Sequence, residues 1–230
     1  MKHSTCFLAA AMLMLTTVFF AGFEKNDNDL GGGNWVDLGL PSGLLWATRN
    51  VGATSPEEYG DYFAWGETIP KYVYNWDNYR YCKGQYNWLT KYCNMSDYGY
   101  CGPYSRFTDD LTTLQPSDDA ATVNWGGDAR TPTEAEWEEL IDHTTAQWTT
   151  RNGVNGRLFT GANGNSLFLP AAGGRDSSLA GAGSVGRYWS SSLSMVFPSD
   201  AICFGFGSDV QATGHGYRYF GFCVRAVRQN

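Results

Sequence analysis

Positive charge is scarce in this sequence. Its 230 residues include 16 Lys and Arg against 23 Asp and Glu, which gives a net charge of −7. Such a chain has no electrostatic reason to bind DNA or RNA, so no nucleic-acid partner is expected. Charged residues make up only 17% and aromatic residues 16%, which excludes a disordered tail and a coiled coil. The length predicts one domain or a tight pair.

Long apolar runs are absent after residue 23, so no membrane span is predicted in the mature chain. The charge-free run Phe7–Phe23 follows a short cationic start and is typical of a secretory signal; a membrane span is the alternative, but the run is short for one. We predict a signal peptide over 1–23, a linker over 24–34 and a domain over 35–230. The junction resembles a lipobox with Phe23 in place of the lipidated cysteine, so export is expected and the mode of anchoring stays open.

Histidines and closely spaced cysteine pairs are also scarce. The three histidines are scattered and no C-x₂₋₄-C pair exists, so neither a zinc site nor another metal or cofactor site is predicted. Removing the signal leaves five cysteines, an odd number, so at least one thiol is free or pairs with another chain. Disulfides persist outside the cytoplasm. The candidates are Cys203, Cys223, Cys82 and Cys93.

The body of the chain predicts short strands and two helices. Strands are expected over 35–40 and 44–51, joined by a Pro-Ser-Gly turn, and later at 167–169, 188–190, 201–206 and 221–227. One helix is expected over 117–125, and a second begins at the capping box Thr133–Glu136, with Trp137, Leu140 and Ile141 on its buried face. The tyrosine-rich stretch 59–104 has little periodicity and predicts an ordered excursion packed by its own rings.

Several segments resemble known families. Residues 126–138 read GGDARTPTEAEWE and resemble the R-L-P-T-E-A-E-W-E segment of formylglycine-generating, sulfatase-modifying enzymes; residues 221–225, GFCVR, resemble their closing segment. A fuller set is similar to the major paralogous (FISUMP) domain of Bacteroidetes surface proteins: LGLPSG at 38–43, YFAWGET at 62–68, DDAA at 118–121, FLPAAG at 168–173, YWSSS at 188–192 and the final Val-Arg. The resemblance implies an α+β, C-type lectin-like fold of the sulfatase-modifying-factor-like branch, with short strands, two main helices and much ordered loop.

Two activities associated with this fold lack their motifs here. The copper-dependent oxidases need two thiolates close together, whereas the C-terminal half holds only Cys203 and Cys223, twenty residues apart. Calcium-dependent lectins use E-P-N or Q-P-D motifs, and here Gln115-Pro116 is followed by an inserted Ser before Asp118. Asp118 and Asp119 are more simply read as helix caps. An enzyme is therefore not expected.

The C-terminal segment 194–220 differs in composition from the rest, and strand alternation places Ile202, Phe204 and Phe206 in the core with Cys203 and Gly205 facing outward. We predict a recognition face with these members: Ser194, Val196, Phe197, Ser199, Asp200, Cys203, Gly205, Ser208, Asp209, Gln211, His215, Tyr217, Tyr219 and Phe220.

Two explanations of this composition stay open. From residue 196 to 210 the chain contains no Met, Trp, Lys, Gln or Glu, the residues that codons randomised at the adenines of AAC cannot encode. That pattern is typical of variable proteins diversified by a retroelement. Ordinary divergence of a surface loop is the alternative.

Strands 201–207 and 219–225 are expected to be joined by a loop over 208–218. Pairing of these strands in one antiparallel register would place Cys203 opposite Cys223 and permit a disulfide. Two reduced thiols are the alternative, because a bulge would shift this register by one residue.

The predicted function is that of an exported cell-surface binding protein, an adhesin or pilus-tip component. Its partner would be a protein or glycan on a host or neighbouring cell, or other pilus subunits. A formylglycine-generating-type oxidase and a structural surface subunit are the alternatives.

Overall fold

The computed structural model describes residues 34–102 and 106–230, which belong to one unit of contacts. The predicted signal peptide and all but the last residue of the predicted linker lie outside the described residues. The described part is mixed α and β, with two α-helices and mostly short strands. Within this part, no helix has both the length and the apolar character needed to cross a bilayer.

The first and last strands of the described chain share one sheet. β1 (Trp35–Asp37) pairs antiparallel with β2 (Leu45–Ala47), and β11 (Val227–Arg228) pairs with the other edge of β2. The predicted turn between β1 and β2 is confirmed: the Gly43 amide donates to the Leu40 carbonyl at 2.9 Å. Gly43 takes a φ of +70°, a conformation that glycine adopts without strain.

Both predicted helices are present. α2 (Glu134–His143) begins with the predicted capping box, because Thr133 accepts from the Glu136 amide and Glu136 accepts from the Thr133 amide. α1 (Ala120–Trp125) is shorter than predicted, since the turn η4 (Pro116–Asp118) precedes it and Asp119 is its N-cap. Of the two expected caps only Asp119 acts as one.

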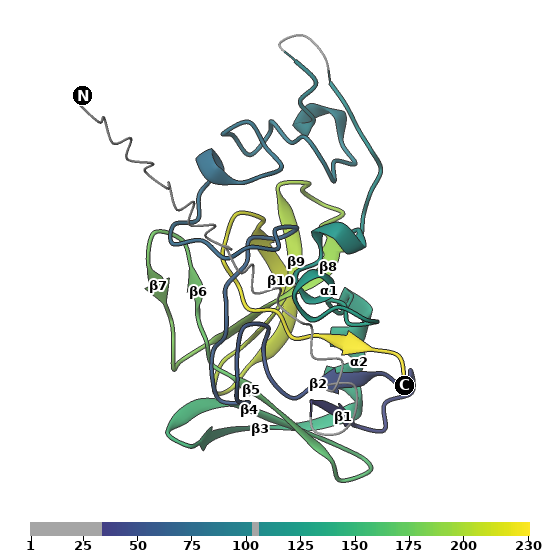
Figure 1. The fold of residues 1–230 in the computed structure, drawn as a ribbon, viewed down its shortest axis with the longest axis vertical. Coiled ribbons are helices and arrows are strands. Elements are labelled where there is room, and N and C mark those ends of the chain that lie inside the picture. The colour runs from purple at the N-terminus through teal and green to yellow at the C-terminus, as the bar shows by residue number, and fades with distance from the viewer. Residues whose placement is uncertain (1–33, 103–105) are drawn as a thin grey trace, which may run out of the picture. The chain divides into compact units, whose positions relative to one another are not determined.

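Three further sheets complete the fold (Figure 1). The antiparallel sheet β3–β4–β5, at the bottom of that view, contains β3 (Thr144–Arg151), β4 (Val154–Gly161) and β5 (Ser166–Pro170). A small ladder joins β6 (Gly174–Arg175) to β7 (Leu179–Ala180). The third sheet contains β8 (Gly186–Leu193), β9 (Asp200–Phe206) and β10 (Gln211–Tyr217), with β9 in the middle.

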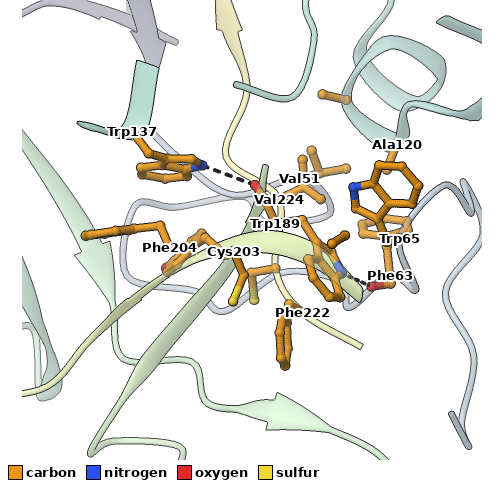
Figure 2. Packing of buried hydrophobic residues seen from close by; sticks show 14 of the residues in the cluster. Val51, Phe63, Trp65, Ala120, Trp137, Trp189, Cys203, Phe204, Phe222 and Val224 are labelled. Carbon is orange, nitrogen blue, oxygen red and sulfur yellow. Dashed lines mark hydrogen bonds between the residues drawn. The ribbon is translucent and has the colours of Figure 1, made fainter. Parts of the chain in front are cut away.

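The core forms where α2 packs on these strands. The Trp137 ring lies 4.7 Å from Phe204 of β9 and 4.9 Å from Trp46 of β2. Trp137 Nε1 donates to the Trp189 carbonyl, and Trp189 Nε1 donates to the Phe63 carbonyl at 2.7 Å (Figure 2). The indole N–H groups of Trp137 and Trp189 are thus satisfied inside the core, whereas Nε1 of the buried Trp46 has no hydrogen-bond partner among the described residues.

The prediction of a strand over 221–227 is wrong except at its last residue. Only Val227 belongs to a regular strand; the residues before it form single bridges to separate elements, including Phe222 to Phe63 and Cys223 to Tyr188. This irregular segment therefore connects several sheets rather than extending one.

The tyrosine-rich excursion is ordered, as predicted, and is described except for residues 103–105. It contains the short 3₁₀ turns η2 (Trp76–Asn78) and η3 (Ser96–Tyr98). Its rings pack on one another edge to face, for example Tyr81 with Tyr79 and Tyr92. In Figure 1 the excursion lies at the top of the view, near the upper ends of β8, β9 and β10.

Candidate functional site

The predicted recognition residues divide between the two ends of the β9–β10 hairpin. Ser208 and Asp209 lie in the turn that joins the strands, and Gln211 opens β10 opposite Phe206. The loop 194–199 lies at the other end, where Asp200 pairs with Tyr217. Because β9 has seven residues at about 3.4 Å each, the two groups are roughly 20 Å apart. They cannot form one contact surface for a small ligand.

Three predicted contact residues are buried and are wrong as ligand contacts: Ser194, Ser199 and Cys203. The Ser194 hydroxyl accepts from the amides of Val196 and Phe197, so it stabilises the loop from inside.

Cys203 is buried because both faces of β9 are covered. The aromatic face lies in the core, as predicted, where Phe204 packs on Trp137 of α2. The opposite face, expected to meet solvent, lies under the rings of Trp189 and Phe222, which are 4.4 Å apart. The sequence-based expectation assumed a sheet with one solvated face. Gly205, on this same face, is partly exposed.

The remaining predicted residues reach solvent at least in part: Val196, Phe197, Asp200, Ser208, Asp209, Gln211, His215, Tyr217, Tyr219 and Phe220.

The strand pairing around the two C-terminal cysteines also differs from the prediction. β9 pairs with β10 and β8, which places Cys203 opposite Gly214 and Trp189. Cys223 instead bridges Tyr188, the neighbour of Trp189. Adjacent strand residues point to opposite faces, so the two thiols lie on opposite sides of β8. The predicted Cys203–Cys223 disulfide is therefore wrong.

The four disulfide candidates are free thiols in this structure. Cys82 Sγ lies 3.0 Å from the Trp76 carbonyl and Cys93 Sγ lies 3.1 Å from the Met95 carbonyl, and each is a donor to that oxygen. Burial raises the pKa of Cys203 to about 11. These thiols act as small buried side chains rather than as nucleophiles.

Partly exposed aromatic rings gather at the loop end of the hairpin. Tyr217, Tyr219 and Phe220 pack on one another, and Trp76 of η2 lies 5.0 Å from Tyr219 and 6.0 Å from Tyr217. Tyr217 is 47% exposed. We call these four residues the aromatic surface. Phe220 stacks on the buried Phe222, so this surface continues into the core.

A small pocket of about 190 Å³ adjoins the aromatic surface through Phe220. We call it the arginine pocket; it is lined by Gly174, Arg175, Asp176, Ala180, Arg187, Phe220 and Phe222. The Arg187 guanidinium lies 5.7 Å from the Phe222 ring, and that of Arg175 lies 5.0 Å from the Tyr62 ring. Neither guanidinium forms an ion pair with any residue in 34–102 or 106–230. Sequence reasoning missed this pocket because its arginines belong to no motif.

A buried arginine holds the aromatic surface in place. Arg218 donates to the carbonyls of Lys91, Tyr92 and Pro198, each at 3.0 Å, and to the Tyr79 hydroxyl at 2.9 Å. It thereby ties the excursion and the loop 194–199 to the chain between Tyr217 and Tyr219. The aromatic surface is therefore anchored to both segments through the buried hydrogen bonds of Arg218.

A second cavity of about 540 Å³ opens beside β1 and β5. Its Arg151 already pairs with Glu57 at 2.6 Å. The cavity is lined from residue 34 onward, where the described chain begins. Across the described ranges, no group of three or more His, Cys, Asp or Glu side chains comes together in a way that could hold a metal.

Comparison of the chain with protein-family models, with curated proteins and with solved structures finds no match in any of the three. A functional proposal therefore depends on the residues of this chain.

Proposed function

We propose that this chain is an exported, surface-displayed binding protein, an adhesin or pilus-tip component, whose ligand is a protein or glycan on another cell. The observation that carries the proposal is the aromatic surface beside the arginine pocket. Partly exposed Tyr and Trp rings on a rigid base are the usual contact residues of recognition surfaces. In this proposal recognition uses the loop end of the β9–β10 hairpin.

We propose further that the fold is C-type lectin-like and of the FISUMP type. The segments that carry the resemblance supply the core of the described domain. Trp65, Trp137 and Trp189 come from three of these segments, and all three are buried. Trp65 Nε1 donates to the Ser190 carbonyl at 2.8 Å, which joins two of the segments directly.

The oxidase alternative finds less support in the geometry. Two thiolates must converge to bind Cu(I), and Cys203 and Cys223 lie on opposite sides of β8. A copper titration followed by a thiol-oxidation assay tests this alternative directly. Stoichiometric copper binding with oxidase activity would overturn the proposal of a non-enzymatic protein.

The recognition claim is tested on glycan and host-protein arrays with two variants that separate the ends of the hairpin. Tyr217→Ala with Tyr219→Ala alters the aromatic surface, whereas the matched control Val210→Ala alters an exposed residue in the distant turn. We expect wild type and control to bind the same ligand and the double variant to lose it. Equal binding by all three forms, or loss in the control alone, contradicts the proposed location.

Diversification of the C-terminal segment is a separate proposal. The structure restricts where it could act, because β9 contributes Phe204 and Phe206 to the core while the loop 194–199 and the turn 207–210 contain exposed residues. Sequencing the downstream DNA tests it: a near-copy of the 3′ coding end with adenine mismatches, beside a reverse transcriptase, is expected. A downstream region without such a copy contradicts it.

A further inference from the structure

The arginine pocket contains two arginines that form no ion pair among the described residues, in a chain whose net charge is −7. Two lysines of the excursion, by contrast, are paired with carboxylates: Lys71 with Glu67 at 2.9 Å and Lys91 with Asp118 at 2.6 Å. The guanidinium groups of Arg175 and Arg187 lie over aromatic rings, those of Tyr62 and Phe222. A guanidinium stacked on a ring keeps its N–H fork available for a carboxylate.

The backbone holds both arginines in fixed positions. Arg175 exchanges two backbone hydrogen bonds with Gly221, at 2.8 and 2.9 Å. The Arg187 carbonyl accepts from the Cys223 amide at 3.2 Å. Both arginines are thus anchored to the irregular segment that also carries Phe222.

Gly174 keeps the pocket open between them. A Cβ at this position would lie 2.7 Å from the Phe222 ring and 3.4 Å from Arg187 Cδ. Any side chain there would displace the ring that supports Arg187. Glycine at position 174 is therefore needed to keep Phe222 in its place in the pocket.

Asp176 makes the pocket selective among anions. Its Oδ1 accepts from the Ser177 hydroxyl at 3.0 Å and from the Ser178 amide at 3.1 Å, and the backbone hydrogen bond leads the causes that lower its pKa. Asp176 is therefore ionised at neutral pH, so the pocket carries two positive charges and one negative charge. This balance favours a singly charged ligand that also has hydroxyl groups to donate to a carboxylate.

Size and neighbours define the ligand further. At about 190 Å³ the pocket is smaller than the roughly 300–1,000 Å³ of typical small-molecule sites, so it fits one terminal residue of a longer ligand. Phe220 is partly exposed, offers an apolar ring to the ligand and belongs also to the aromatic surface, whereas Phe222 lines the pocket as a buried ring. Flat C–H faces, hydroxyl groups and one carboxylate occur together in acidic sugars.

We propose that the arginine pocket binds the carboxylate of a terminal acidic sugar of the uronate class, with the next sugars lying on the aromatic surface. Arg175 and Arg187 hold the carboxylate, and Asp176 accepts from a sugar hydroxyl. This inference rests on the proposed recognition function and names the chemistry of its ligand.

The test is a calorimetric titration of the full chain with trigalacturonate, with its methyl-esterified form and with a sulfated neutral trisaccharide. Esterification removes the charge and leaves the sugar, so we expect the affinity to fall at least about tenfold. Arg187→Gln should give a similar loss with the acid form, and Arg187→Lys a smaller one. The matched control is Arg80→Gln, an exposed arginine that lies over the Tyr81 ring, outside the pocket.

Equal affinity for the acid and its ester, or unchanged binding by Arg187→Gln, would overturn the inference. Binding of the sulfated trisaccharide alone would overturn the choice of a carboxylate. The experiments distinguish failure of this inference from failure of the proposed recognition function. If binding of an array ligand depends on Tyr217 and not on Arg187, the recognition function is supported and the acidic-sugar inference is wrong. No dependence on either residue removes both.

Discussion

Replacing Arg218 by Met tests how the candidate site is supported. Arg218 is fully buried and no carboxylate within the described residues pairs with it. Its guanidinium bonds instead to three carbonyls and one hydroxyl, and it lies 5.0 Å from the Trp65 ring and 5.2 Å from the Tyr79 ring. Met fills a similar volume and makes none of these bonds.

The expected loss follows from the acceptors left behind. A buried polar group without a partner costs about 1–3 kcal/mol, and three carbonyls lose their donor at once. Relief of the buried charge and entry of water offset part of this cost. We expect the free energy of unfolding to fall by about 3–5 kcal/mol, a large fraction of the roughly 5–15 kcal/mol of a typical domain. Arg218→Lys keeps the charge and part of the bonding, so it should lose about half as much.

Urea unfolding followed by tryptophan fluorescence measures this loss, with an unchanged m-value as the check on two-state behaviour. Hydrogen exchange should localise the change, with faster exchange at 76–100 and 194–200, the segments that Arg218 joins to the hairpin. Arg80→Met, an exposed arginine, is the control and should change stability by less than about 0.5 kcal/mol. If the Arg218→Met variant stays within about 1 kcal/mol of wild type, the supporting role is refuted.

Three other predictions follow from local contacts. Alkylation of the native protein at mildly alkaline pH should leave Cys203 and Cys223 unmodified, because burial raises both pKa values; labelling before unfolding contradicts this. Burial alone would raise the pKa of Asp118, but hydrogen bonds led by that from Lys91 hold it below its ordinary value, so its stabilising contribution is present at neutral pH and disappears in acid. Asp118→Asn should flatten the fall of unfolding free energy below about pH 4, and an unchanged slope argues against the pair. Thr133→Ala should cost about 1 kcal/mol in urea unfolding and Thr133→Ser almost nothing, and equal losses would exclude the cap.

Local sequence signals predicted local structure well. The turn after β1 and the capping box of α2 each depend on residues within four positions of one another, so their geometry is decided by the chain nearby. Strand β8 and the aromatic face of β9 were predicted for the same reason, because alternation is a property of consecutive residues.

Strand pairing was predicted less well, because it joins residues far apart in the chain. The expected loop 208–218 contains glycines at 214 and 216, yet most of it is β10, since hydrogen bonding to β9 compensates for weak intrinsic propensity. Gly216 is needed there: a Cβ would lie 2.9 Å from Phe222 and 3.2 Å from Trp189.

The sequence by itself therefore determined the turn after β1, the capping box of α2 and the apolar positions of α2 and β9 that enter the core. Only the tertiary structure decided what the second face of β9 meets, and hence that Cys203 is buried and apart from Cys223. It also decided the site: Arg175, Arg187 and Phe220 come from three separate segments, and no spacing in the chain relates them. They converge because Gly221 and Cys223 hydrogen-bond to two different strands, a long-range contact that no local pattern encodes.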